Sequence, residues 1–279
     1  MKSKLVREKS VKLLILHAFL AIVATALVLP FMWMVLTSVK RLDEVEGTSW
    51  LPEVFQWRNY REVFNVRGVL FGRWYWNSLF VASWVTFLQV FTSSLAAFSF
   101  SRLEWKGRDK VFLAYLATMM LPGLVMMIPN YQNMIRFGLV DTYPGLVLPA
   151  AFTAFGTFLM RQFMMSIPKS LDEAALIDGA SPWQLYWTVI LPLIRPAVVT
   201  LTIFTFMGNY NSMFWPLVMM KSPEKYTLPI GLLSFDSTQG QQTNLLMAAV
   251  TMSVVPMILV FVTMQKQLVR GIMIGAVKG

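Results

Sequence analysis

The chain has 279 residues, of which 56% are hydrophobic and 14% are charged, and its formal net charge is +10. This composition is too apolar for an ordinary soluble domain and is typical of a protein that crosses a membrane several times. The chain contains no cysteine and a single histidine, His17, which excludes disulfides, thiol nucleophiles and histidine-clustered metal sites.

Six stretches qualify, or nearly qualify, as helices that cross about 30 Å of hydrocarbon. They cover about residues 13–36, 78–100, 111–128, 142–160, 196–220 and 245–262, and the fourth is the shortest. The first follows a basic N-terminus, as a signal peptide would. Its apolar run is too long for a cleaved peptide, however, and no small-residue cleavage pattern follows it, so we interpret it as a retained span. The sequence predicts an all-α, six-span membrane protein with one transmembrane domain over residues 1–279.

The distribution of basic residues predicts the orientation of these spans. With the N-terminus in the cytoplasm, 15 Lys and Arg residues fall on the cytoplasmic side and 9 on the outer side. An excess of Lys and Arg in short loops marks the cytoplasmic side of a membrane protein. We therefore expect both termini, and the loop between the fourth and fifth spans, to face the cytoplasm. This retention of basic loops also explains the net charge better than binding to nucleic acid does.

The loop over residues 168–196 carries two short predicted helices. Ser170, followed three residues later by Glu173, predicts a capping box at the start of the first helix. Gly179 can adopt the left-handed conformation that ends this helix, and Ser181 caps the second. The pattern indicates a polar helical hairpin on which a partner docks. The alternative is an amphipathic interfacial helix that only stabilises the bundle, and a DNA-binding hairpin is disfavoured because both ends are tethered to the membrane.

The same loop contains a longer pattern, in which Glu173-Ala174-Ala175 is followed by Asp178-Gly179-Ala180, Leu191-Pro192 and Pro196. This pattern resembles the cytoplasmic EAA loop of bacterial ABC importer permeases. In that family the loop is a coupling helix that lies in a cleft of the ATP-hydrolysing subunit. The resemblance implies a contact with a separate ATPase for Glu173, Ala174, Ala175, Asp178, Gly179, Ala180 and Pro192.

Three further segments resemble the carbohydrate-uptake branch of that family, and most closely its maltose-type second permease subunit. They are residues 210–217, 223–229 and 268–279. In that subfamily the C-terminal tail reaches the interface of the ATPase dimer. The resemblance implies the same contact for Gly271, Gly275, Lys278 and Gly279. The alternative is a basic terminus held near anionic lipid.

No catalytic or metal-ligating residue is predicted in this chain. It lacks the Gly-x-x-x-x-Gly-Lys-Ser/Thr loop that cradles phosphates, so ATP and Mg would be bound by a partner ATPase. The spans also lack the runs of acidic residues that are usual in ion-coupled carriers. We therefore expect the non-catalytic permease subunit of an ATP-driven importer of a carbohydrate, an oligosaccharide in our interpretation, in the bacterial inner membrane. The alternative is a secondary carrier or channel that works without an ATPase.

The expected partners follow from the same interpretation. They are a second homologous permease, two ATPase subunits, a periplasmic or lipid-tethered solute-binding protein and membrane lipid, with no nucleic acid.

The fifth span carries amides and aromatic rings, which suit the hydroxyls and apolar ring faces of a sugar. Phe204, Gly208, Asn211 and Trp215 would share one face of a continuous helix. The candidate pathway residues are Asn209, Tyr210, Asn211, Phe214 and Trp215. The alternative is ordinary helix packing, in which the glycine allows close contact and the Asn side chains bond between helices.

Overall fold

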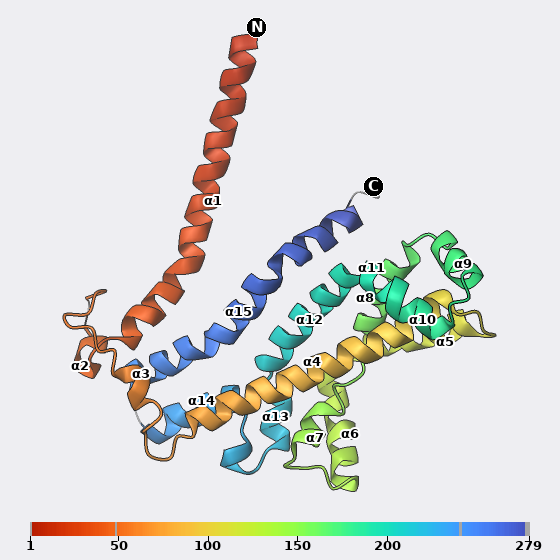
Figure 1. Ribbon diagram of the computed structural model, residues 1–279. Helices are drawn as coiled ribbons and strands as arrows, with labels where there is room; N and C mark the ends of the chain where they lie inside the picture. The colour runs from red at the N-terminus through yellow and green to blue at the C-terminus, as the bar shows by residue number, and fades with distance from the viewer. Residues whose placement is uncertain (1, 48, 240–241, 277–279) are drawn as a thin grey trace. The chain divides into compact units, whose positions relative to one another are not determined.

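The computed structural model describes residues 2–47, 49–239 and 242–276, without the side-chain surroundings of residues 2–11, 234, 236–239 and 267–276. Every regular element in these ranges is a helix (Figure 1). The internal contacts divide the chain into two compact units. One comprises Met1–Phe71 with Leu232–Val254, and the other comprises Gly72–Gly231 with Val255–Gly279.

The first unit contains helix α1 and the loop that follows it. Its elements are α1 (Lys2–Ser38), α2 (Leu42–Val45), α3 (Asn59–Glu62), most of α14 (Leu228–Gln239) and the first part of α15 (Thr243–Ala276). The apolar part of α1 has a mean hydropathy of 2.5, and 0% of its most apolar window is buried within the chain. The buried Asn59 side chain holds the loop to the end of α1, because it donates to the carbonyl oxygens of Ser38 and Lys40, each at 2.9 Å.

The second unit is organised around the long helix α4 (Phe71–Arg102). The elements that follow are α5 (Arg108–Ala117), η1 (Thr118–Met120), α6 (Gly123–Arg136), α7 (Tyr143–Val147), α8 (Ala154–Met165), α9 (Ser170–Ile177), α10 (Pro182–Gln184), the π-helix η2 (Leu185–Ile190), α11 (Leu191–Leu193), α12 (Arg195–Tyr210), α13 (Phe214–Met219) and η3 (Pro223–Lys225). Helix α12 runs along α4 (Figure 1), and Thr205 of α12 donates to Gln89 of α4 at 3.1 Å.

Three described helices are long and apolar enough to cross a membrane. They are Lys12–Ser38, Phe71–Arg102 and Thr243–Lys266, and they overlap the first, second and sixth predicted spans. Two pairs of shorter helices reach this length only if each pair forms one bent span. The pair made by α5–η1 and α6 bends by 101°, and the pair made by α10–α11 and α12 bends by 75°. The described residues thus hold three to five such spans, against the six predicted.

The third predicted span, residues 111–128, is not one straight helix. It breaks at Leu121 and Pro122, where Leu121 adopts an extended conformation with ψ 119°. Proline has no backbone N–H to continue a helix, and its ring pushes the preceding residue out of the helical region. These two effects of Pro122 explain why the helix breaks here.

The fourth predicted span, residues 142–160, consists of the two short helices α7 and α8 with residues 148–153 between them. Two side chains of α4 bind the backbone at this break. Gln89 donates to the carbonyl oxygen of Ala150, and Thr92 donates to that of Ala151 at 2.8 Å. Irregular backbone is tolerated at membrane depth where the protein itself satisfies its polar groups. The hydrogen bonds from α4 meet this requirement.

Asp141 joins two loops of the second unit. Its carboxylate accepts hydrogen bonds from the backbone N–H groups of Lys221 and Ser222, from the Ser222 hydroxyl at 2.6 Å and from Lys225 Nζ at 2.9 Å. Partial burial raises the pKa of Asp141, but the hydrogen bonds outweigh burial and hold this pKa well below its ordinary value. The loop before α7 is therefore tied to the loop after α13.

Candidate coupling site and solute pathway

The predicted hairpin between α8 and α12 is present, and its turn lies at Gly179. This residue has φ +81°, in the left-handed region where glycine carries no steric penalty. The Gly179 N–H bonds to the Leu176 carbonyl at 3.0 Å, and the Ala180 N–H bonds to the Ala175 carbonyl at 2.9 Å. These bonds close the last turn of α9 as a Schellman-type end, which confirms the predicted role of Gly179.

The sequence predicted a side-chain cap at the start of each hairpin helix, and the structure has this cap on α10 but not on α9. Ser181 and Gln184 form a full capping box, in which each side chain accepts from the other residue's backbone N–H, at 3.3 and 2.8 Å. The capping box predicted for Ser170 and Glu173 is wrong. Lys169 already has helical angles, φ −65° and ψ −21°, so Ser170 is the first helical residue rather than the cap. The Glu173 N–H consequently bonds to the Lys169 carbonyl at 3.1 Å.

The hairpin exposes a mixed polar and apolar surface. Six of the seven predicted coupling residues lie on it: Glu173, Ala174, Asp178 and Gly179 are exposed, and Ala175 and Ala180 are half-buried. The predicted coupling set did not include three exposed apolar side chains of the same hairpin. They are Ile177, Trp183 and Leu176, which are 86%, 57% and 53% exposed. Large apolar side chains at the tip of a polar loop were the signal that could have identified them.

A buried apolar cluster lies next to the hairpin and packs against it. It joins α4, α8, η2 and α12, and its members include Ala97, Phe98, Met160, Met164, Tyr186, Ile190, Ala197 and Leu201. The Tyr186 hydroxyl lies 2.7 Å from Ser94 Oγ, and the Tyr186 ring packs edge-on against Phe98 with centroids 5.2 Å apart. Ala175 of α9 packs against this cluster, so the hairpin rests on the helical core of the second unit.

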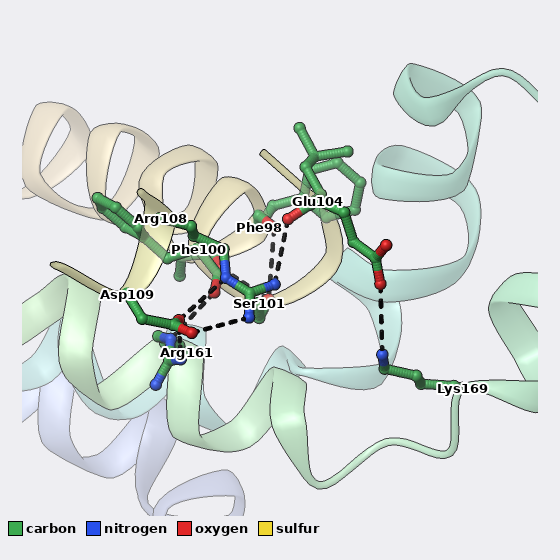
Figure 2. A network of polar contacts seen from close by, with 10 residues as sticks. Phe98, Phe100, Ser101, Glu104, Arg108, Asp109, Arg161 and Lys169 are labelled. Atoms are coloured by element: carbon green, nitrogen blue, oxygen red, sulfur yellow. Dashed lines mark hydrogen bonds and ion pairs between the residues drawn. The ribbon is translucent and has the colours of Figure 1, made fainter. Parts of the chain in front are cut away.

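Charged side chains add a second layer of contacts between α9, α8 and the end of α4. Arg102, the last residue of α4, pairs with Asp172 of α9 at 2.8 Å. Close by, Arg161 of α8 donates to the Phe100 carbonyl at 3.1 Å and lies 3.6 Å from Asp109 of α5 (Figure 2). The Arg161 guanidinium also lies over the Phe112 ring, 4.2 Å from its centroid. Arg102 therefore ties the hairpin to α4, while Arg161 ties α8 to α4 and α5.

The remaining coupling and tail residues lie elsewhere. Pro192 is on α11, where it lines a largely apolar pocket of about 810 Å³ between α4, η2–α12 and the later part of α15. Gly271 and Gly275 belong to the helical backbone of α15. Lys278 and Gly279 lie outside the described residues.

The predicted pathway face on the fifth span is wrong in its geometry. Helix α12 ends at Tyr210, and Trp215 belongs to the separate helix α13, so Phe204, Gly208, Asn211 and Trp215 do not share one helix face. The chain leaves the helix at Asn211, whose ψ of 1° departs from helical values.

Three of the five candidate pathway residues nevertheless meet in one pocket. Asn209, Phe214 and Trp215 line a pocket of about 330 Å³ together with Asn130 of α6, which the sequence did not identify. Tyr210 is instead buried, with 2% exposure, and stacks on Phe206. Asn211 donates to the Met207 carbonyl at 3.0 Å and does not line the pocket.

Within the described ranges, no group of three or more His, Asp and Glu side chains could hold a metal ion. The larger pocket is lined mostly by apolar side chains, with several hydroxyls and Arg195, and the smaller one by apolar side chains with the amides of Asn130 and Asn209.

Residues 89–274 match the model of the family described as the binding-protein-dependent transport system inner membrane component. The chain belongs to this family. Its members are transmembrane permease subunits of ABC importers, and the apolar helices described above agree with that location. The sequence-based prediction of such a permease is therefore confirmed, and nothing in these likenesses supports a secondary carrier or channel.

Relatives of this permease subunit match along nearly its whole length. The arabinooligosaccharides transport system permease of Halalkalibacterium halodurans is 31% identical, and the match covers 94% of each chain. The trehalose/maltose transport system permease of Thermococcus litoralis is 30% identical, with 98% of this chain and 99% of the relative covered. A crystal structure of a bacterial ABC transporter involved in import of the acidic polysaccharide alginate contains a chain similar at a TM-score of 0.80. It is 27% identical, with 91% of this chain and 95% of that chain covered.

Proposed function

We propose that this permease subunit carries an oligosaccharide inward across the membrane, driven by ATP hydrolysis on separate subunits. The names of its relatives support a saccharide, since they include permeases for arabinooligosaccharides and for trehalose or maltose. The solved relative concerns alginate, an acidic polysaccharide, so both neutral and acidic saccharides are compatible with the likenesses.

The observation that carries the proposal is the capped, exposed hairpin of α9 and α10. A membrane protein gains little from presenting Ile177 and Trp183 to water at the end of a capped turn unless a partner covers them. Glu173 and Asp178 add charges beside these side chains, so the surface combines an apolar centre with a polar rim, as protein interfaces do. In this proposal, the hairpin lies in a groove of the ATPase subunit, which covers these side chains.

The family of this chain supports an assembly of several subunits. We propose a pair of permeases, each docked to one of two ATPase subunits, with a periplasmic or lipid-tethered binding protein delivering the solute. The excess of Lys and Arg on one side of the predicted spans supports a cytoplasmic position for both termini and the hairpin. ATP and Mg would be bound by the ATPase pair, and the tail from Gly271 to Gly279 would reach the interface between its two subunits.

The solute would pass the pocket that contains Asn209, Phe214 and Trp215. An aromatic ring can pack against the apolar face of a sugar, and amides can exchange hydrogen bonds with its hydroxyls. Asn130 of α6 adds a second amide to the same pocket. In this proposal, these four side chains contact the saccharide during transit.

Uptake by the complete complex in liposomes tests the coupling proposal. Glu173→Lys and Gly179→Pro should each lower ATP-driven uptake by about tenfold or more, the effect of losing 1.4 kcal/mol or more of coupling. Glu46→Lys is the matched control, because Glu46 is an exposed acid in the loop after α1. Normal ATP-driven uptake in both hairpin variants, with normal membrane insertion, would refute the assignment.

A further inference from the structure

One guanidinium group joins three helices at the base of the hairpin. Arg102 is the last residue of α4, and its side chain is only 3% exposed. Its Nη1 donates to Asp172 Oδ2 of α9 at 2.8 Å, while its Nη2 donates to the Met164 carbonyl at the end of α8 and to the Ile167 carbonyl at 3.1 Å. Because these acceptors lie on different segments, the planar guanidinium fixes direction as well as distance.

The electrostatic setting makes this link strong. Asp172 lies in the first turn of α9, where the helix dipole favours a carboxylate, and Arg102 binds carbonyls at the C-terminal end of α8, where the dipole favours a cation. The Asp172 side chain is 14% exposed, so water screens the pair weakly. Removing one partner of such a pair leaves a buried, unpaired charge and is strongly destabilising.

The pair also has unused bonding capacity. Arg102 Nε and Asp172 Oδ1 are both buried and have no hydrogen-bond partner. A small rotation of the Asp172 carboxylate can therefore present Oδ1 to Arg102 Nη1 in place of Oδ2, without separating the charges. The ion pair between Arg102 and Asp172 can therefore stay formed while α9 shifts slightly relative to α4.

A second ion pair between the same segments provides a contrast. Lys169, just before α9, lies 3.9 Å from Glu104, just after α4, and the two side chains are 74% and 85% exposed (Figure 2). Exposed pairs of this kind contribute little, because water and salt screen them and ordering the side chains costs entropy. Of the two ion pairs between these segments, the one made by Arg102 is therefore the one that can carry force, beside the apolar contact of Ala175 with the buried cluster.

We propose that Arg102 is a positioning residue that transmits displacement of the hairpin into α4. The inference rests on the proposed coupling role of the hairpin. Helix α4 is distant from the hairpin in sequence but reaches both pockets, through Val81 in the smaller one and Ser94 in the larger one. A partner that moves α9 thus moves α4 as well as the segments joined to the hairpin along the chain, because sliding α9 alone would break the buried pair.

The variants Arg102→Gln, Asp172→Asn and the double variant, in the complete complex in liposomes, test this role. Each single variant should lower the melting temperature of the complex, and the double variant should recover most of that loss because no unpaired charge remains. Saccharide uptake per ATP hydrolysed should nevertheless stay about five- to tenfold below wild type in the double variant. Glu104→Gln, which removes the exposed pair, should leave both quantities unchanged.

Recovery of uptake together with stability in the double variant would show that Arg102 is only structural, and would overturn the proposal. Unchanged uptake in all variants would do the same. If both single variants fail to assemble, uptake is measured in the double variant and in Arg102→Lys instead. If these two variants also fail to assemble, Arg102 has a purely structural role and the proposal is overturned. Failure of the coupling proposal itself is distinguishable, because it appears as normal ATP-driven uptake in the Glu173→Lys and Gly179→Pro variants.

Discussion

Ile177 is the side chain whose removal tests the docking surface most directly. It is 86% exposed at the end of α9, so it contributes almost nothing to packing within the subunit. Full burial of an isoleucine side chain by a partner is worth about 1.5–3 kcal/mol, and Ile177→Ala should forfeit about 1–2 kcal/mol of that. The predicted consequence is an affinity for the ATPase subunit about 5- to 30-fold weaker. Alanine is the better helix former, so α9 itself should persist.

The assay is equilibrium binding of the ATPase subunit to the permease pair in nanodiscs, measured by biolayer interferometry. Ile135→Ala is the matched control, because Ile135 is 55% exposed near the end of α6 and lies outside the hairpin. Its dissociation constant should equal that of wild type. An Ile177→Ala dissociation constant within about twofold of wild type, in a complex that folds normally, would refute the claim that a partner buries this side chain.

Three further substitutions have defined outcomes. Gly179→Ala places a Cβ where no atom lies within 4 Å, so its cost is the left-handed backbone alone, about 1–2 kcal/mol, and uptake should fall without being abolished. Ser181→Ala removes a side-chain cap worth about 1 kcal/mol and should raise amide hydrogen exchange in residues 182–190 about fivefold. Because the folded-state pKa of Asp141 is lowered, its contribution to stability is complete above the unfolded pKa and is lost as the pH falls through the folded pKa. The melting-temperature difference between wild type and Asp141→Asn should therefore be constant from about pH 8 to pH 5 and shrink only below about pH 4.

The long continuous helices could be predicted from the sequence, whereas the broken ones could not. In α1, α4 and α15 an uninterrupted apolar run and an uninterrupted helix coincide. Hydropathy reports the environment of a segment and not the continuity of its backbone. The gap between α7 and α8 is stable because Gln89 and Thr92 of α4 bind its carbonyls, and no local signal reveals such distant donors. Pro122 was a visible cause for the break in the third predicted span, but the sequence did not indicate the angle of 101° between the two helices.

In the candidate site, too, local features could be predicted from the sequence, whereas contacts between distant residues could not. The turn at Gly179 and the cap at Ser181 are local, and the sequence identified both. The same pattern at Ser170 failed because helical angles begin one residue earlier, at Lys169. Asp172 and its partner are separated by 70 residues, so sequence spacing could not pair them. Likewise, the meeting of Asn130 with Asn209 in one pocket is a product of tertiary packing.

The interrupted segment of α7 and α8 has a consequence for how the subunit is made. Helix α8 has 12 residues, about 18 Å at 1.5 Å per residue, and α7 has 5, so neither can bridge the hydrocarbon layer by itself. The carbonyls of Ala150 and Ala151 find their donors on α4, which emerges earlier from the ribosome. This segment therefore cannot be a stable membrane element by itself, and the carbonyls at its break are satisfied only when it packs against α4.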